Sequence, residues 1–333
     1  MTVSRRIFTR GAILAPAALA GPALLRVGDA GEAAAAGPVE APQAQTPQVQ
    51  RRRVGEIEVI ALMDGALQRP TGMLLGYDET AASAAATLAH RRHDPAALTL
   101  GINGYVIRTG DRVIAVDTGS PAGLAPTLGR WHAALAAAGL AADRVDTVVL
   151  THPHPDHVGG MTDPRSGMAR LARAQVIASA VDWAFTFDAA VYAASPREVQ
   201  VGFDISRAMI APYDAAKTLI APGAEVAPGL TTVAMPGHTP GHMGLRVDSG
   251  RESLLIWGDL LIAPAYQFAH PDWAFALDAD KAAAAATRAR VLDMAAADRI
   301  MVAGMHLDFP GFGHVERARQ GYGFVAAPWD YRA

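Results

Sequence analysis

The stretch Thr151-His152-Pro153-His154-Pro155-Asp156-His157-Val158-Gly159-Gly160 is the most informative part of the sequence. It places three imidazoles and a carboxylate within six residues. It follows directly on Val145 to Leu150, an apolar run that predicts a buried strand. In an extended segment, alternate side chains point to the same side. We therefore expect the first two histidines and Asp156 to face one way, and His157 to be turned by the bend that follows.

The composition of this stretch points to a metal site without sulfur. Imidazole nitrogen and carboxylate oxygen are ligands that zinc, manganese, cobalt and iron share. Pro153 and Pro155 fix the backbone angle φ and should stiffen the loop. The sequence has no cysteine, which excludes disulfides, thiolate ligands and a cysteine nucleophile.

Further candidate ligands follow later predicted strands, where the functional groups of α/β proteins usually lie. They are His238 after Leu230 to Ala234, Asp259 after Leu254 to Trp257, and His306 after Ile300 to Ala303. Each of these residues alone could be structural. Together with the first cluster, they predict one functional site.

Short β-branched runs alternate with alanine-rich helical patterns along the chain, which predicts an α/β fold. Ile102 to Ile107 and Val113 to Val116 read as a hairpin, followed by a helix within Ala122 to Ala138 and a later helix over Lys281 to Ala297. We expect one domain over residues 54–333, preceded by a Pro- and Gln-rich linker over residues 37–53.

The first 36 residues resemble a targeting segment. Arg5 and Arg6 precede a weakly apolar run from Ala12 to Leu25, and small residues follow at Ala33 to Ala36. This layout predicts a twin-arginine signal peptide, export of the folded protein by the twin-arginine machinery, and a periplasmic or secreted location. A disordered basic tail is the alternative.

The formal net charge is −3, and the leader carries four arginines against Asp29 and Glu32, so the chain without it is more acidic and offers no evident basic surface for nucleic acid. The aromatic-rich stretch over residues 181–213 predicts a cap over the site, with an ordinary packed helical pair as the alternative. Apolar candidates for a substrate pocket come from this stretch and from the loops around Asp259. They are Trp183, Phe185, Ile262, Phe268, Trp273 and Leu277.

Together with Asp117-Thr118-Gly119, the ordered set of histidines and aspartates resembles the metallo-β-lactamase superfamily over nearly the whole mature chain. The resemblance implies an αββα sandwich, with two mixed sheets flanked by helices. It also implies two divalent metal ions, zinc first, with manganese, cobalt or iron as alternatives. One ion would be held by His152, His154 and His238 and the other by Asp156, His157 and His306, with Asp259 bridging them. Asp117 would support the site without binding metal, and we expect the same of His242.

Within the superfamily, the string from Val302 to His314 resembles methyl parathion hydrolase and its lactonase and arylesterase relatives. That likeness implies hydrolysis of lactones, aryl esters or phosphotriesters by a hydroxide that bridges the metals, with a homodimer as one further expectation. Asp156 and Asp259 could orient this hydroxide or relay its proton. Tyr192, Tyr213 and Tyr266 are candidate donors to the substrate.

Other functions remain open on the same fold. They are a glyoxalase-like thioester hydrolase, a mononuclear iron sulfur dioxygenase and a periplasmic metal-binding protein without catalysis. The complete ligand set favours the dinuclear hydrolase over the last two. The near absence of basic residues in Gly321 to Ala333 disfavours the glyoxalase-like enzyme.

Overall fold

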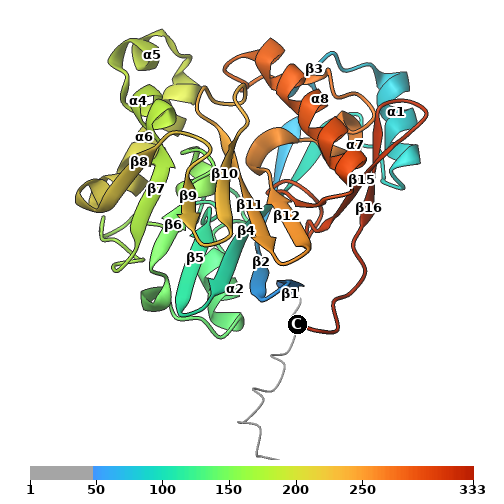
Figure 1. Ribbon diagram of the computed structural model, residues 1–333. Coiled ribbons are helices and arrows are strands. Elements are labelled where there is room, and N and C mark those ends of the chain that lie inside the picture. The colour runs from blue at the N-terminus through green and yellow to red at the C-terminus, as the bar shows by residue number, and fades with distance from the viewer. Residues whose placement is uncertain (1–47) are drawn as a thin grey trace, which may run out of the picture. The chain divides into compact units, whose positions relative to one another are not determined.

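The computed structural model describes residues 48–333, which form two large β-sheets with helices on their outer sides (Figure 1). The predicted signal peptide, and the linker up to residue 47, lie outside the described residues. In residues 48–333, no helix is long and apolar enough to cross a bilayer.

The first sheet has the strand order β1-β2-β4-β5-β6-β7-β8. Its antiparallel part is β1 (Val49–Val54), β2 (Ile57–Pro70), β4 (Ala97–Thr109) and β5 (Arg112–Val116), and parallel pairs then join β5 to β6 (Thr147–Val149), β7 (Gln175–Ser179) and β8 (Lys217–Ile220).

The second sheet has the order β16-β15-β14-β12-β11-β10-β9. Its strands are β9 (Glu225–Ala227), β10 (Leu230–Ala234), β11 (Met243–Ser249), β12 (Glu252–Ile256), β14 (Met301–Ala303), β15 (Gly313–Arg317) and β16 (Tyr322–Ala326), and only the β12–β14 pair is parallel. A small third sheet pairs β3 (Leu74–Leu75) with β13 (Ala274–Phe275).

Helices fill the connections between the strands. They are α1 (Glu79–Leu88), α2 (Trp131–Ala137), α3 (Pro155–Val158), α4 (Ala180–Phe187), α5 (Ala189–Ala194), α6 (Arg197–Ile210), α7 (Pro264–Gln267) and α8 (Lys281–Asp298). Short 3-10 turns are η1 (Thr71–Met73), η2 (Ala142–Arg144), η3 (Ala211–Ala216) and η4 (Gly258–Leu260).

The alternation of side chains along the strands produces the layers. Ile60 and Leu62 of β2 pack in one buried cluster with Trp131 of α2, on the outer face of the first sheet. Val59, one residue away, packs in a second cluster with Leu245 of the second sheet. Because successive strand residues point to opposite faces, a single strand contributes to both the helix layer and the contact between the sheets.

The outer face of the second sheet is covered in the same way. Leu255 of β12 and Trp257 share a buried cluster with Val291 and Leu292 of α8. The order of layers is therefore helix, sheet, sheet, helix, which confirms the αββα sandwich predicted from the sequence.

The predicted start of the domain at Val54 is wrong, because β1 already begins at Val49. The basic run Arg51 to Arg53 resembles a solvated linker, yet the Arg51 side chain is only 2% exposed. Its guanidinium pairs with Glu58 and donates to the carbonyl of Ala138. A carboxylate on the neighbouring strand and a carbonyl from a distant part of the chain compensate the burial of this charge.

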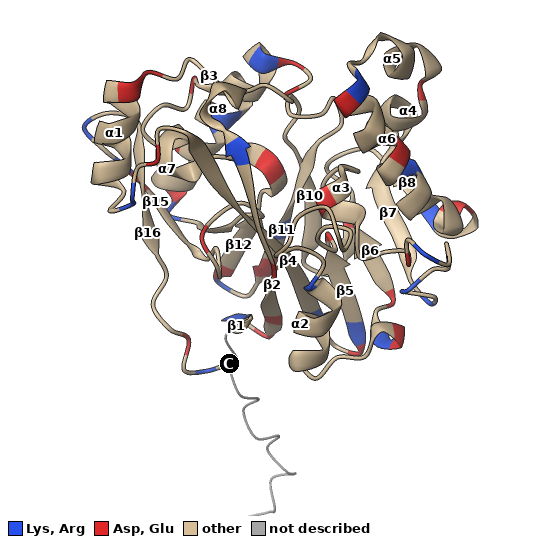
Figure 2. Cartoon of the chain, turned by 180° about the vertical axis from the view of Figure 1, so that it is seen from behind, with Lys and Arg blue, Asp and Glu red and all other residues tan. Residues whose placement is uncertain are grey.

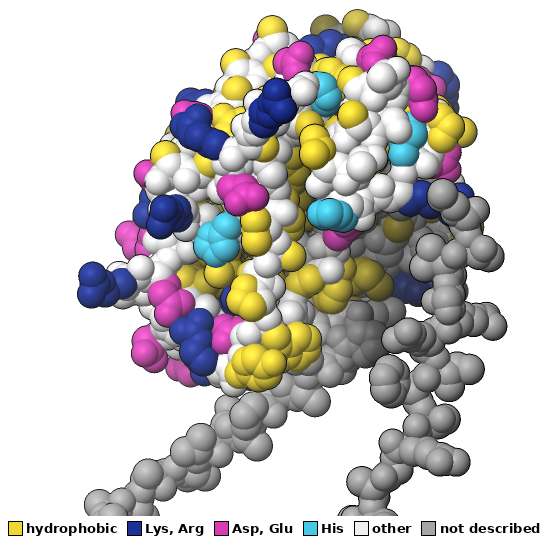
Figure 3. Space-filling view, turned by 90° about the vertical axis from the view of Figure 1, so that its right-hand side faces the viewer, with side chains coloured by type: hydrophobic (Ala, Val, Ile, Leu, Met, Phe, Trp, Pro, Cys, Tyr) yellow, Lys and Arg dark blue, Asp and Glu magenta, His cyan; other side chains and the backbone are white. Residues whose placement is uncertain are grey.

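Charged side chains are mixed over the molecule. Figure 2 shows Lys and Arg interspersed with Asp and Glu in the cartoon seen from behind. On the face in Figure 3, hydrophobic side chains are likewise separated by charged and polar ones.

Candidate metal centre

The first four candidate ligands lie where β6 gives way to α3. His152 and His154 precede this short helix, and Asp156 and His157 lie within it. Pro155 occupies a first-turn position of the helix, where a missing N–H costs nothing because it would have no intrahelical partner. The proline that stiffens the loop therefore also starts the helix that turns His157.

The remaining candidates come from the second sheet. His238 follows β10, Asp259 lies in η4 directly after β12, and His306 follows β14. The ends of these strands meet the β6–α3 loop at one edge of the sandwich. The structure thus brings all the predicted ligands into one cluster.

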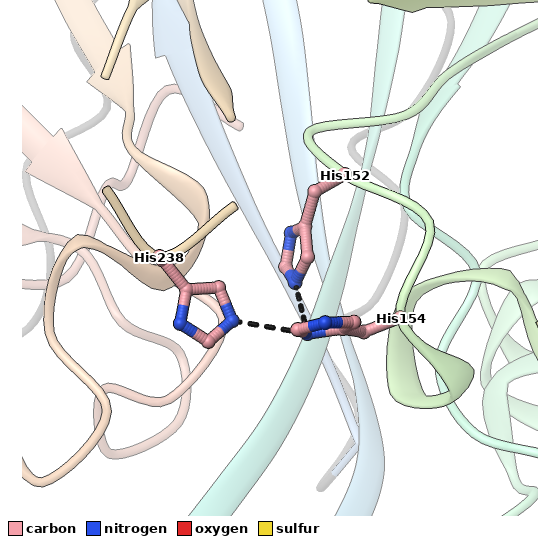
Figure 4. A group of neighbouring side chains, drawn as sticks. All are labelled: His152, His154 and His238. Atoms are coloured by element: carbon pink, nitrogen blue, oxygen red, sulfur yellow. Dashed lines mark hydrogen bonds between the residues drawn. The ribbon is translucent and has the colours of Figure 1, made fainter. Parts of the chain in front are cut away.

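Three overlapping groups have ligand atoms that all lie within 4.8 Å of one another. They are His152, His154 and His238; His152, His157 and Asp259; and Asp156, His157 and His306. Figure 4 shows the first group, with Nδ1 of His154 lying 3.0 Å from Nε2 of His152 and 3.0 Å from Nε2 of His238.

Asp259 lies between the groups. Its Oδ1 is 3.2 Å from Nε2 of His157, and its Oδ2 is 3.1 Å from Nε2 of His306 and 3.3 Å from Nε2 of His238. Asp156 lies farther out, with its Oδ2 3.8 Å from Nε2 of His157 and 3.7 Å from Nε2 of His306. The carboxylate of Asp259 thus faces histidines of both predicted metal sites.

The outward ring nitrogens of four of these histidines are held by other groups. Nδ1 of His157 donates to Asp117 at 2.7 Å, and Nδ1 of His306 donates to the carbonyl of Gly101 at 2.8 Å. Nδ1 of His238 donates to Asp278 at 2.8 Å, and Nδ1 of His152 lies 3.1 Å from the Thr151 hydroxyl. Each Nε2 therefore points into the cluster, as in metal sites whose ligands are oriented from behind.

Two atoms of the cluster test directly whether the residues fit a metal. Nε2 of His157 and Oδ1 of Asp259 are buried and face each other at 3.2 Å, and neither has a hydrogen-bond partner in the described part of the chain. Unpaired buried polar atoms are costly. Nitrogen atoms bound to one tetrahedral zinc stand about 3.3 Å apart, close to the separations found here. The side chains fit divalent metal ions.

The electrostatics of the cluster favour the metal-binding forms of two histidines. Burial and the neighbouring His238 lower the pKa of His154 to about 3, and burial with His157 and His154 holds the pKa of His152 well below its usual range. Neutral imidazole is the form that binds metal. Burial opposes ionisation of Asp259, but His157 and His306 hold its pKa well below the usual value.

Asp117 holds the first loop by hydrogen bonds. Its buried carboxylate accepts hydrogen bonds from the backbone N–H and the hydroxyl of Thr151 as well as from His157. This single side chain fixes both ends of the segment that carries four candidate ligands.

His242 supports Asp259 rather than joining the cluster. Nδ1 of His242 donates to the carbonyl of Met235, and its Nε2 accepts the backbone N–H of Asp259 at 3.0 Å. Both ring nitrogens are therefore engaged, and neither is available to a metal.

Asp278 and Arg288 are supporting residues that the sequence did not indicate. Asp278 is buried, binds Nδ1 of His238 and accepts the backbone N–H of Phe275. Arg288 of α8 is 1% exposed, lies 3.7 Å from Asp278, and donates to the carbonyl of Leu260. The signal that could have found Arg288 is a lone arginine on the alanine-rich face of a helix next to a predicted metal loop.

A cavity of about 380 Å³ lies beside the His306 loop. It is lined on one side by Gly101, whose carbonyl accepts from His306, and by Asp308 and Phe309. Met63 of β2 and Tyr266 of α7 are among the other lining residues. The cavity thus reaches the loop that carries one of the candidate ligands.

The six residues predicted for a substrate pocket are not brought together, and within residues 48–333 none of them lines this cavity. Ile262 and Trp273 pack in one buried cluster, while Phe268 and Trp183 pack in two others. Phe185 is partly buried, with its ring centroid 5.8 Å from that of Phe203, and Leu277 is 39% exposed. Their role in binding substrate stays a prediction.

The three candidate tyrosines are also separated. Tyr213 is buried and bonds to the backbone of Leu171 and Met161, so its role is structural. The Tyr192 hydroxyl bonds to Asp204, and the Tyr266 hydroxyl lies 3.2 Å from Nδ1 of His93. Of the three, Tyr266 lines the cavity.

Residues 98–306 match the family model of the Metallo-beta-lactamase superfamily. The chain belongs to this superfamily. A search of curated proteins finds no match. Among solved structures, this superfamily member is similar to a protein described as hydrolase AbOPH in the beta lactamase superfamily. The identity is 26%, the TM-score is 0.79, and the match covers 86% of this chain and 100% of that one.

Two further structures share the fold. AidC, described as a dizinc quorum-quenching lactonase in complex with a product, is 22% identical with a TM-score of 0.77, and the match covers 85% of this chain and 98% of that one. A probable metal-dependent hydrolase from Staphylococcus aureus is 18% identical with a TM-score of 0.68, over 83% of this chain and 99% of that one. The superfamily and its hydrolase neighbours support a metal-dependent hydrolase.

Proposed function

We propose that this protein is a dinuclear metal-dependent hydrolase of lactones, aryl esters or phosphotriesters. The observation that carries the proposal is the cluster of three overlapping ligand groups, in which Nε2 of His157 and Oδ1 of Asp259 are buried, face each other at 3.2 Å and make no hydrogen bond in the described residues. A bound metal would compensate the burial of these polar atoms better than their contact with each other does.

Two ligand sets can be assigned within the cluster. His152, His154 and His238 would hold one ion, and Asp156, His157 and His306 the other, with Asp259 shared. Divalent ions at such a site lower the pKa of a coordinated water to near 7 and polarise the oxygen of the substrate, which is the chemistry that ester hydrolysis needs.

The protein groups around these ligands have separate tasks. Asp117 and Asp278 orient His157 and His238, and His242 holds the backbone of Asp259. The Asp156 side chain is 19% exposed and that of Asp259 only 4%. Asp156 is therefore the carboxylate that solvent reaches. Because its Oδ2 faces His157 and His306, we assign its other oxygen, Oδ1, the task of relaying a proton during turnover.

The substrate class rests on two supports. One structural neighbour is described as a lactonase, and the string from Val302 to His314 resembles methyl parathion hydrolase and its relatives. The cavity beside His306 offers room for the non-reacting part of a neutral ester, since its lining combines Met63, Pro264 and Phe309 with polar groups.

The location and the assembly belong to the same proposal. We propose export by the twin-arginine route, a mature protein in the periplasm or outside the cell, and a homodimer as the form to test first. Export of a folded chain would allow the metal to be bound before transport.

The test combines metal analysis with a substrate panel. Purified mature protein is analysed for bound metal and assayed with acyl-homoserine lactones, aryl esters and methyl parathion. We expect two equivalents of metal per chain and hydrolysis that Asp259→Ala abolishes, while Asp298→Ala, which removes an exposed carboxylate outside the cluster, retains it. One equivalent of iron without hydrolysis would overturn the proposal and favour a dioxygenase or a metal-binding protein. Preferred hydrolysis of thioesters would assign the glyoxalase-like class instead.

A further inference from the structure

The loop from Pro236 to His242, which carries His238, lies between two helices that come from different parts of the chain. A Cβ atom on Gly237 would lie 2.2 Å from the backbone nitrogen of Ala284 in α8. A Cβ atom on Gly241 would lie 2.3 Å from the hydroxyl of Ser179 and 2.7 Å from the backbone nitrogen of Asp182 in α4. The loop is therefore in direct van der Waals contact with both helices.

Asp182 makes the polar part of the contact with α4. Its Oδ2 accepts the Thr239 hydroxyl at 2.6 Å, and its Oδ1 accepts the backbone N–H of Gly241 at 2.6 Å. The residue is 1% exposed. Both oxygens of a buried carboxylate are thus engaged by the loop, on the residues that follow His238.

Asp182 also belongs to the helical segment that the sequence predicts to be a cap. Helices α4, α5 and α6 pack together, and α6 contacts α3, the helix that carries Asp156 and His157. The guanidinium of Arg207 in α6 lies 4.7 Å from the ring centroid of Tyr192 in α5 and donates to the carbonyl of Thr186 in α4. A displacement of this segment would therefore reach the cluster from two sides.

We propose that Asp182 is a positioning residue that ties the His238 loop to helix α4, so that metal binding by His152, His154 and His238 is coupled to the position of the helical segment over residues 180–210. The inference rests on the proposed function, because it needs His238 to bind a metal. A group that holds a ligand loop in place changes metal affinity without touching the metal. Because coupling between two sites is reciprocal, bound zinc should in turn stabilise α4.

The experiment measures zinc affinity of the metal-free full chain by competition with a chelator. We expect Asp182→Asn to bind zinc about 10-fold more weakly than the wild type, because Asn offers one acceptor oxygen where the loop uses two. Thr239→Val, which removes only the hydroxyl donor, should also lose affinity, and Thr239→Ser should restore it. These two variants keep the test decisive if Asp182→Asn folds poorly.

A second readout reports the coupling itself. Hydrogen exchange of the backbone amides in residues 180–187 should slow when zinc is added to the wild type and should change less in Asp182→Asn. Asp143→Asn is the matched control. Asp143 is an exposed carboxylate in η2, outside both the His238 loop and residues 180–210, so the zinc affinity of this variant should stay within twofold of that of the wild type.

The outcomes separate this inference from the function on which it rests. If the wild type binds two zinc ions while Asp182→Asn and Thr239→Val bind them equally well, Asp182 has no positioning role and only this inference is overturned. If the wild type binds no zinc, the proposed function fails and this inference fails with it.

Discussion

Two loops supply the histidines of the group in Figure 4, and they are held in place differently. The loop from Thr151 to His157 is stiffened by its own prolines and helix, and its two ends are tied by the adjacent residues Asp117 and Thr118. The carbonyl of Thr151 also accepts the backbone N–H of Met243. The His238 loop is held by three separate elements: Asp182 in α4, Asp278 ahead of α8, and the body of α8 itself. The first loop is thus stiffened by its own sequence and tied at its ends, whereas the second is packed between helices from different parts of the chain.

The largest expected effect comes from removing the side chain that ties both ends of the first loop. Asp117→Ala leaves two groups on Thr151 and the ring of His157 as buried donors without an acceptor. We expect a loss of about 3–5 kcal/mol in the free energy of unfolding, measured with urea on metal-free protein. The control Asp143→Ala, which removes an exposed carboxylate in η2, should change the free energy of unfolding by less than about 0.5 kcal/mol. A loss below about 1 kcal/mol for Asp117→Ala would mean that the Asp117 hydrogen bonds are not a main support of the loop.

The second prediction separates the His238 loop from α4. In Gly241→Ala the new methyl group would overlap Ser179 and the backbone of Asp182, so the loop or the helix must shift. We expect a loss of about 2 kcal/mol in the free energy of unfolding and weaker zinc binding. The matched control is Gly72→Ala, where a Cβ atom meets nothing within 4 Å and which should be nearly neutral. Equal stability of both variants would contradict the close packing of the loop.

A third variant tests the support behind the His238 ring. Asp278→Asn keeps the size of the side chain but replaces the charged acceptor of Nδ1 of His238 by a neutral amide. We expect zinc affinity to fall about 10-fold, with a loss in the free energy of unfolding as well, because the neutral amide offers one acceptor oxygen where two are used and leaves the buried Arg288 without a carboxylate beside it. Asp280→Asn serves as control, because Asn replaces Asp well at the N-cap of α8. Unchanged zinc affinity in Asp278→Asn would mean that the carboxylate of Asp278 does not support the metal-binding position of His238.

The smallest effect is expected for the internal stiffening of the first loop. Pro153→Ala should lower the free energy of unfolding by about 0.5 kcal/mol, because the unfolded chain gains conformational freedom. Zinc affinity should fall about twofold, whereas Pro164→Ala, at an exposed loop, should leave it unchanged. A loss of zinc affinity above about 10-fold in Pro153→Ala would show that proline holds this loop more strongly than Asp117 does.

The difference between the two histidine loops also explains which features could be predicted from the sequence. The ligands His152 to His157 are contiguous, and the strands around them have clear β-branched runs, so the αββα fold and the members of the cluster follow from local pattern and resemblance. Both β4 and α8 lie where they were expected, at Ala97–Thr109 and Lys281–Asp298.

The sequence could not predict contacts made by residues far apart in the chain. Asp182, Asp278 and Arg288 look like ordinary helix or loop residues until the fold brings them against the His238 loop. The early strand β1 was missed because Arg51 to Arg53 resemble solvated residues, whereas the fold buries Arg51 against Glu58 and the carbonyl of Ala138, which is distant in the sequence. The six residues predicted for the pocket lie in separate places, because an apolar side chain that fits a pocket fits a core equally well, and four of the six lie in the core.

The most direct measurement is anomalous X-ray diffraction at the zinc edge from crystals of the zinc-loaded protein. We predict two peaks, one among His152, His154 and His238 and the other among Asp156, His157 and His306, with the Asp259 carboxylate between them. A single peak, or peaks away from these residues, would contradict the proposed dinuclear metal centre.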